Sequence, residues 1–221
     1  MAFAAERSGS RNILRRLADG SGTEESLLAL PEHTHVGSWS PDAQMLAMEE
    51  SRSETAWDIW ILPLQGDRKP KLFLQTPFSE EAPAFSPDGR WIAYMSDESR
   101  RFEVYVQPYP GPGGKWQIST EGGTEPVWAR NGRELFYRSG DKMMAVEIMT
   151  QPAFRASTPK VLFEGRYEAT TGLGIRTNYG VSPDGQRFLM VKGGEQQQAP
   201  TQINVVLNWF EELKRRVPSG Q

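Results

Sequence analysis

A short turn sequence recurs along this chain at intervals of about 40 to 50 residues. It reads Ser-Pro-Asp at 40–42, 86–88 and 182–184, and residues 129–132 form a degraded copy that keeps the glycine. Proline pre-sets φ in such a turn, aspartate bonds its own backbone, and the glycine that follows accepts a left-handed conformation. Each copy therefore predicts a tight turn between two strands, and the spacing indicates a repeated structural unit.

The most complete unit runs from Glu81 to Thr120. After its turn, Trp91–Met95 has the composition of a buried strand. Phe102–Val106 and Lys115–Ser119 alternate apolar and polar residues, as half-buried strands do. The proline- and glycine-rich segment 109–114 between them is expected to be a loop. Together with the segment before the turn, this predicts four short antiparallel strands per unit, which is the make-up of a propeller blade.

The segments S-P-D-G-x-x-I-A-Y, V-Y-V-Q-P-Y-P-G and K-W-Q-I-S-T resemble the repeats of TolB-like, or WD40-like, β-propeller proteins. The resemblance covers nearly the whole chain and is strongest to the propellers that end many bacterial receptor serine/threonine kinases, although the kinase catalytic signatures are absent. It implies an all-β propeller and an extracytoplasmic domain of a longer bacterial protein. It also implies a role as an interaction or sensing platform. Because such relatives have more propeller upstream, we expect the chain to be the tail of a longer gene.

Fitting the unit to the whole chain predicts a single domain of five blades whose first and last blades are incomplete. The blades are expected at 1–31, 35–76, 81–120, 124–165 and 175–207, with a short helix at 208–216. The first blade has strands at Ala2–Ala5, Asn12–Ala18 and Glu25–Leu30 and lacks its inner strand, and the last blade ends with Ile203–Leu207. An insertion at 151–159 lengthens the last loop of the fourth blade. Because unpaired strand edges template pairing with another chain, we predict a homodimer or higher oligomer that covers the open ends.

The composition excludes several classes of function. A net charge of −3 provides no electrostatic attraction to nucleic acid or to an anionic membrane. The absence of cysteine excludes disulfides and thiolate metal sites. No apolar run approaches the roughly 20 residues of a membrane-spanning helix, and Met1–Ala5 is too short for the core of a signal peptide. Nucleophile-elbow, P-loop and dinucleotide-binding motifs are also absent, so no catalytic residue can be assigned.

Residues just ahead of each turn are the candidates for a binding site. In a propeller the loop that enters each inner strand lies at the mouth of the central channel, where a protein, peptide or small molecule can bind. The residues four or five positions before the turns are Val36, Ala82 and the polar candidates His35, Glu81, Thr124, Glu125, Thr177 and Asn178. The turn aspartates are instead expected to cap their own turns on the opposite face.

Both histidines of the chain, His33 and His35, lie two positions apart and would share one face of an extended strand. With Glu81 and Glu125 they are the candidate ligands of a divalent cation, zinc or calcium, since imidazole and carboxylate together suit a first-row metal. The alternative is a polar rim that holds no metal. Two functions therefore stay open, and the resemblance favours the first: a non-catalytic binding module. The second is a metal-dependent hydrolase of ester, lactone or phosphotriester bonds, in which the cation activates water.

Overall fold

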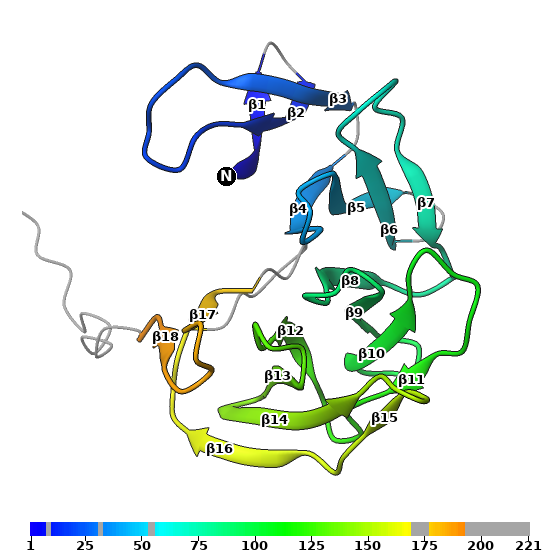
Figure 1. Cartoon of the computed structure of the whole chain (residues 1–221), viewed down its shortest axis with the longest axis vertical. Helices are drawn as coiled ribbons and strands as arrows, with labels where there is room; N and C mark the ends of the chain where they lie inside the picture. The colour runs from blue at the N-terminus through cyan, green and yellow to red at the C-terminus, as the bar shows by residue number, and fades with distance from the viewer. Residues whose placement is uncertain (8–9, 31–32, 53–55, 169–176, 193–221) are drawn as a thin grey trace, which may run out of the picture. The chain divides into compact units, whose positions relative to one another are not determined.

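The computed structural model describes residues 1–7, 10–30, 33–52, 56–168 and 177–192. In these residues every regular element is a strand, and Figure 1 labels the strands in chain order. No helix in the described part of the chain is long and apolar enough to cross a membrane. The strands belong to one unit, Met1–Val191, and form antiparallel sheets, each built from consecutive strands. This is the topology of propeller blades, as predicted.

The first three sheets are blades I to III. Blade I has three strands, β1 (Ala2–Arg7), β2 (Ser10–Arg15) and β3 (Glu25–Leu30). Blade II has four, β4 (Thr34–Trp39), β5 (Met45–Arg52), β6 (Ala56–Pro63) and β7 (Lys71–Leu74). Blade III has β8 (Glu80–Phe85), β9 (Trp91–Ser96), β10 (Glu103–Pro108) and β11 (Trp116–Gln117). Blade I thus lacks an inner strand in the described chain, in the position expected from the repeat.

Blades IV and V complete the described fold. Blade IV contains β12 (Thr124–Trp128), β13 (Glu134–Ser139), β14 (Lys142–Met149) and β16 (Lys160–Glu164), with the short β15 (Arg155–Ala156) paired to the end of β14. Blade V contains β17 (Tyr179–Val181) and β18 (Phe188–Met190). The strand predicted at 203–207 and the helix predicted at 208–216 lie outside the described residues.

The insertion at 151–159 is more ordered than the predicted loop. It carries β15 and also brings Phe154, which is 7% exposed, against blade III. The ring centroid of Phe154 lies 4.8 Å from that of Trp91 and 4.7 Å from that of Trp116. The insertion therefore covers apolar surface that blade III alone leaves open, which explains why it folds back onto the sheet.

β2 is also shorter than predicted. It ends at Arg15 rather than Ala18 because the chain turns over Leu17–Gly20, where the Gly20 N–H donates to the Leu17 carbonyl over 3.1 Å. Leu17 is exposed, so the apolar pattern that suggested a longer strand has no core to face.

The core lies between neighbouring blades rather than within any one sheet. Ile13 of blade I packs in one cluster with Leu46 of blade II, and Ile59 of blade II packs with Tyr94 of blade III. Corresponding clusters join blades III and IV, and blades IV and V. Each sheet therefore buries both faces only when its neighbours are present, and burial of these faces is the main source of stability.

The Ser-Pro-Asp turns have the structure that their composition predicts. At Ser86, the Gly89 N–H donates to the Ser86 carbonyl over 2.9 Å, and Gly89 has a φ of 70°. The Ser86 hydroxyl donates to Asp88 Oδ1 over 2.6 Å, and the Arg90 N–H donates to the same oxygen over 3.1 Å. The turns at Ser40 and Ser182 repeat these bonds, so the aspartates cap their own turns.

Candidate ligand-binding site

The inner strands β4, β8 and β12 each carry an irregularity at the same place. Their pairing with the second strand shifts register after Val36, Glu81 and Thr124. In β8 and β12 the residue directly after the shift, Ala82 or Glu125, has a positive φ, of 53° and 57° respectively, and is followed by a proline. A bulge of this kind re-aims side chains and leaves backbone groups without a ladder partner. The sites that the sequence singled out lie at these bulges.

The bulges line a pocket of about 440 Å³. Its walls are formed by prolines, small residues, two valines, two aromatic residues and one acid: Val36, Gly37, Ser38, Glu49, Ala82–Phe85, Pro87, Pro126–Trp128 and Thr177. The volume is in the range of sites for small ligands. Gly37 is packed so closely that a Cβ there would lie 2.6 Å from Pro83 Cγ. The pocket is thus formed where the inner strands of three neighbouring blades approach one another.

Glu49 on β5 joins blade II to the bulge of blade III. Its carboxylate is 2% exposed, and Oε2 accepts a hydrogen bond from the Ala82 N–H over 2.7 Å. His35 Nδ1 lies 3.1 Å from Glu49 Oε1, and the imidazole stacks on Trp57 with 4.5 Å between ring centroids. A carboxylate therefore supplies the acceptor that the sheet ladder does not provide for Ala82, and His35 is buried against it.

Glu125 makes a corresponding link from blade IV to the segment that enters blade V. It is 1% exposed, and its Oε2 accepts from the Asn178 N–H over 3.0 Å. The Tyr179 hydroxyl donates to the Glu125 carbonyl over 2.8 Å. Arg138 Nη1 lies 3.8 Å from Glu125 Oε1 and donates to the carbonyl of Glu168 over 2.6 Å. Burial raises the pKa of Glu125, while the Asn178 hydrogen bond and the Arg138 charge oppose that rise.

The remaining predicted residues are in different surroundings. Glu81 is buried and accepts from the Ser79 hydroxyl over 2.9 Å, whereas Thr124 is half-buried opposite Arg138. Thr177 is exposed and lines the pocket.

The four candidate metal ligands are not brought together. His33 is exposed, while His35 and Glu125 are held in the separate contacts described above. Among the described residues, no group of three or more histidine, aspartate or glutamate side chains is placed to hold a metal ion.

Glu49 and Arg138 are the residues that sequence reasoning missed. They lie directly opposite His35 and Thr124 in the second strands. Counting residues back from the turn does not show that Glu49 pairs with His35 or Arg138 with Thr124. The bulge lies between the turn and each of these pairs and shifts the strand register there. A signal was nevertheless present, since each is a charged residue that follows an apolar run within a second strand.

Glu80, at the start of β8, is a second unusual acid. It is 1% exposed, and its Oε1 accepts from the Thr76 hydroxyl and, over 3.5 Å, from that of Ser96. Its Oε2 has no hydrogen-bond partner within the described chain. Burial raises the pKa of Glu80 to about 7, with a smaller contribution from the negative charge of Asp58. A large fraction of this side chain is therefore protonated at neutral pH.

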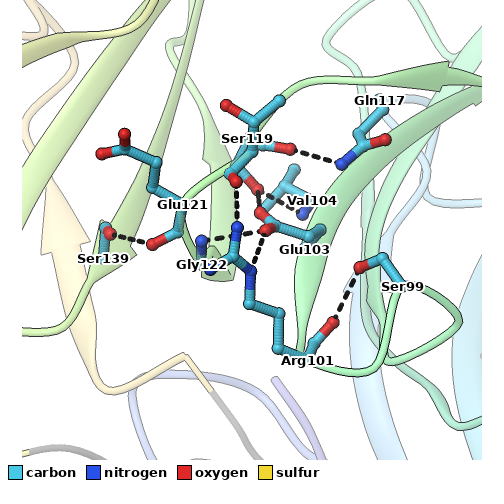
Figure 2. A network of polar contacts seen from close by, with 10 residues as sticks. Ser99, Arg101, Glu103, Val104, Gln117, Ser119, Glu121, Gly122 and Ser139 are labelled. Carbon is cyan, nitrogen blue, oxygen red and sulfur yellow. Dashed lines mark hydrogen bonds and ion pairs between the residues drawn. The ribbon is translucent and has the colours of Figure 1, made fainter.

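Glu103, at the start of β10, is buried in a polar network that Figure 2 shows. Its Oε1 accepts from Arg101 Nε over 2.7 Å and from the Gly122 N–H over 2.9 Å. The Ser119 hydroxyl donates to Oε2. These bonds hold the segment 119–123, which leads into β12 and so to the third wall of the pocket. Because both carboxylate oxygens accept hydrogen bonds from the fold, we assign Glu103 a structural role.

Comparison with solved structures identifies the fold. TolB from Acinetobacter baumannii superposes with a TM-score of 0.64 and 16% identity over 86% of this chain and 46% of that protein. A putative TolB from Agrobacterium tumefaciens superposes with a TM-score of 0.61 and 20% identity, over 86% of this chain and 68% of that protein. An oligogalacturonate lyase in complex with manganese superposes with a TM-score of 0.58 and 14% identity, over 83% of this chain and 51% of that protein.

The chain therefore has a TolB-like β-propeller fold and spans less than half of the first of these proteins. No family model and no curated protein matches its sequence. Likeness at this level of identity extends to the fold alone, because one fold hosts many functions.

Proposed function

We propose that the chain is a non-catalytic binding module that takes a ligand or a protein segment in the inner-strand pocket. One observation carries the proposal: the acids around the bulges are buried and hydrogen-bonded within the fold. Glu49 accepts from the Ala82 N–H, and Glu125 accepts from the Asn178 N–H. A general base needs access to the proton that it removes, and these carboxylates are engaged in joining blades. The only ionisable residue among those that line the pocket is Glu49, and both of its carboxylate oxygens are already engaged within the fold, Oε2 with the Ala82 N–H and Oε1 with His35.

The polar groups that face the pocket suit recognition by hydrogen bonds. Ser38 Oγ accepts from the Phe85 N–H over 2.7 Å, which leaves its hydroxyl hydrogen to donate to a ligand. Thr177 adds an exposed hydroxyl at the rim. Pro83 and Pro126 supply rigid apolar walls. An apolar group of the size of one or two amino-acid side chains, with a hydrogen-bond acceptor beside it, fits this lining.

The test is a ligand-observed NMR screen with small fragments and tripeptides against the full chain. Binding in the pocket predicts hits that disappear in the variant Thr177→Trp, which places an indole at the rim. Thr23→Trp is the matched control, because Thr23 is exposed in the loop after β2. Hits that bind both variants equally, or the absence of any hit, would contradict the proposal.

The metal-dependent hydrolase stays the alternative prediction. It requires a bound cation and turnover, so metal analysis by mass spectrometry is combined with aryl ester, lactone and phosphotriester substrates. Turnover that a chelator abolishes would replace the binding proposal with the enzyme. Zinc titration by calorimetry, repeated with His33 and His35 changed to alanine, tests the proposed ligands directly.

The wider setting of the module rests on the sequence resemblance. On that basis we propose an extracytoplasmic propeller of a longer bacterial protein, such as a receptor kinase. The predicted homodimer or higher oligomer is checked by light scattering over a wide range of concentration, and a constant monomer mass would contradict it.

A further inference from the structure

The turn between β12 and β13 keeps the shape of the Ser-Pro-Asp turns but not their carboxylate. Ala129 stands in place of the serine and Asn131 in place of the aspartate, while Gly132 has the left-handed φ of 70° that Gly89 also has. The Gly132 N–H donates to the Ala129 carbonyl over 2.9 Å, as the corresponding N–H does in the turn that begins at Ser86. The turn is therefore complete in its backbone and carries an amide where the repeat has an acid.

Asn131 makes the backbone contact that the turn aspartates make. Its Oδ1 accepts from the Arg133 N–H over 2.8 Å, and Asp88 Oδ1 accepts from the Arg90 N–H over 3.1 Å. The Arg90 guanidinium also binds the second carboxylate oxygen, with 2.9 Å between Nε and Oδ2. Arg133 has the equivalent place after Gly132 and is exposed, but a neutral amide offers it no negative charge. A carboxylate at residue 131 thus fits the turn without rearrangement.

The residue after Asn131 makes this amide chemically unstable. The sequence contains no other asparagine followed by glycine, since the remaining asparagines precede isoleucine, tyrosine, valine or tryptophan. Glycine has no Cβ to hinder its backbone nitrogen and adopts many conformations. That nitrogen can attack Cγ of the asparagine: the N–Cγ bond forms, the Cγ–Nδ2 bond breaks, and the N–H proton leaves with Nδ2 as ammonia.

Water then opens the cyclic imide at one of its two carbonyls. Addition at the side-chain carbonyl gives aspartate with an ordinary backbone. Addition at the backbone carbonyl gives isoaspartate, in which the chain runs through the former side chain and is longer by one methylene group. The two products therefore differ in backbone length and not in charge.

We propose that Asn131 is a site of spontaneous deamidation, and that the fold accepts its aspartate product as a further turn of the Ser-Pro-Asp type. The attack requires the turn to open, because the Gly132 N–H is engaged with the Ala129 carbonyl. Arg130 and Asn131 are exposed at the tip of this turn, and local opening of surface turns costs far less free energy than global unfolding.

The closed turn distinguishes the two products. An aspartate keeps the bond to the Arg133 N–H and gains the ion pair that Asp88 makes with Arg90. The extra methylene group of isoaspartate moves the Gly132 N–H away from the Ala129 carbonyl and removes the tight turn. Aspartate at residue 131 should therefore preserve the stability of the chain, whereas isoaspartate should lower it.

Deamidation also changes the charge of a cavity. Asn131 is one of the residues that line a cavity of about 980 Å³ between the turns of blades III and IV, together with Asp88, Arg133 and Glu134. A new carboxylate adds a negative charge to this lining. The cavity thus becomes more acidic with the age of the molecule.

The first test follows the full, folded chain over several days at mildly alkaline pH. Chymotryptic peptides are analysed by mass spectrometry, with fragmentation that separates aspartate from isoaspartate. Asn131 is expected to deamidate about tenfold faster or more than Asn12 and Asn178, which precede larger residues. The free peptide V-W-A-R-N-G-R-E-L-F, residues 127–136, is the unfolded reference. An intact Asn131 in the chain while this peptide deamidates would overturn the proposal, because the turn would then protect the amide.

The second test compares the products by urea unfolding. Asn131→Asp should have a midpoint equal to or above that of the parent, and the isoaspartate form, isolated by chromatography from the aged chain, a lower one. Asn178→Asp is the matched control and should be destabilised, because Asn178 Nδ2 donates to the Glu168 carbonyl over 2.7 Å and its N–H to the buried Glu125 carboxylate. A midpoint of Asn131→Asp as low as that of Asn178→Asp would show that the turn does not accept the acid.

Discussion

Replacing Glu80 by glutamine should stabilise the protein at alkaline pH and have little effect in acid. The side chain is 1% exposed, and its Oε2 has no hydrogen-bond partner within the described chain. Ionisation therefore places a poorly solvated charge at the start of β8, close enough to Asp58 to be repelled by it. Glutamine keeps the carbonyl acceptor for the Thr76 hydroxyl and carries no charge.

The size of the effect follows from the pKa of Glu80, which is about 7 in the folded protein against a usual value of 4.5. Between these values the folded state binds more protons than the unfolded state, so the stability contributed by protonated Glu80 is fully present below pH 4.5 and is lost as the pH rises through 7. The difference between the two pKa values corresponds to a loss of about 3 kcal/mol at most in the free energy of unfolding. We expect the free energy of unfolding of Glu80→Gln to exceed that of the parent by about 2 to 3 kcal/mol at high pH and by almost nothing in acid.

The measurement is urea unfolding of both proteins at closely spaced pH values on either side of the Glu80 pKa. Glu121→Gln is the control, because Glu121 is exposed and its loss measures the general effect of removing one negative charge. The free-energy curves of parent and Glu80→Gln should diverge with rising pH. Curves that stay parallel throughout would refute the reasoning, since they would mean that Glu80 ionises equally easily in both states.

Three further variants test the contacts between blades. Phe154→Ala should lower the free energy of unfolding by about 3 kcal/mol, because it removes a buried ring from between Trp91 and Trp116; an unchanged urea midpoint would show that the insertion does not support blade III. Gly37→Ala should cost about 1 to 3 kcal/mol in thermal unfolding, because the new Cβ would lie 2.6 Å from Pro83 Cγ. Glu49→Ala should cost about 2 to 4 kcal/mol in urea unfolding, since it removes the acceptor of the buried Ala82 N–H; a loss comparable to that of the exposed Glu24→Ala would contradict this role.

The arrangement of strands could be predicted because its signals are local. The turn at Ser86 is formed by the hydroxyl and carboxylate of residues only two positions apart, so any copy of the motif marks the same structure. The period of the motif then identified the blades and the open position in blade I. The short β15 could not be predicted in this way. Its Arg155–Ala156 has no alternation, and it is held by pairing with Ile148 and Met149 of β14.

The surroundings of the candidate site could be predicted only in part. Counting from the turns located the bulge residues, including the left-handed Ala82 and Glu125. It did not predict that Glu125 bonds a backbone group of the following blade, or that Glu49 does the same from a second strand. Such contacts depend on the approach of two sheets, and a bulge that shifts the register by one residue hides them from strand counting.

The bonds that close the inner strands have a consequence for how this protein can change. These bonds come from different places in each blade. Between blades II and III they come from Glu49 of the second strand and Ser38 of the inner strand, and between III and IV from the Trp128 indole, which donates to the Ala84 carbonyl. Between IV and V they come from Glu125 of the inner strand and from Arg138 of the second strand. The blades are therefore alike in shape but not exchangeable in order. A duplicated or transposed blade would lie beside a neighbour that lacks the partners for its inter-blade hydrogen bonds. A new blade can therefore be added only together with new hydrogen-bonding residues in the blades beside it.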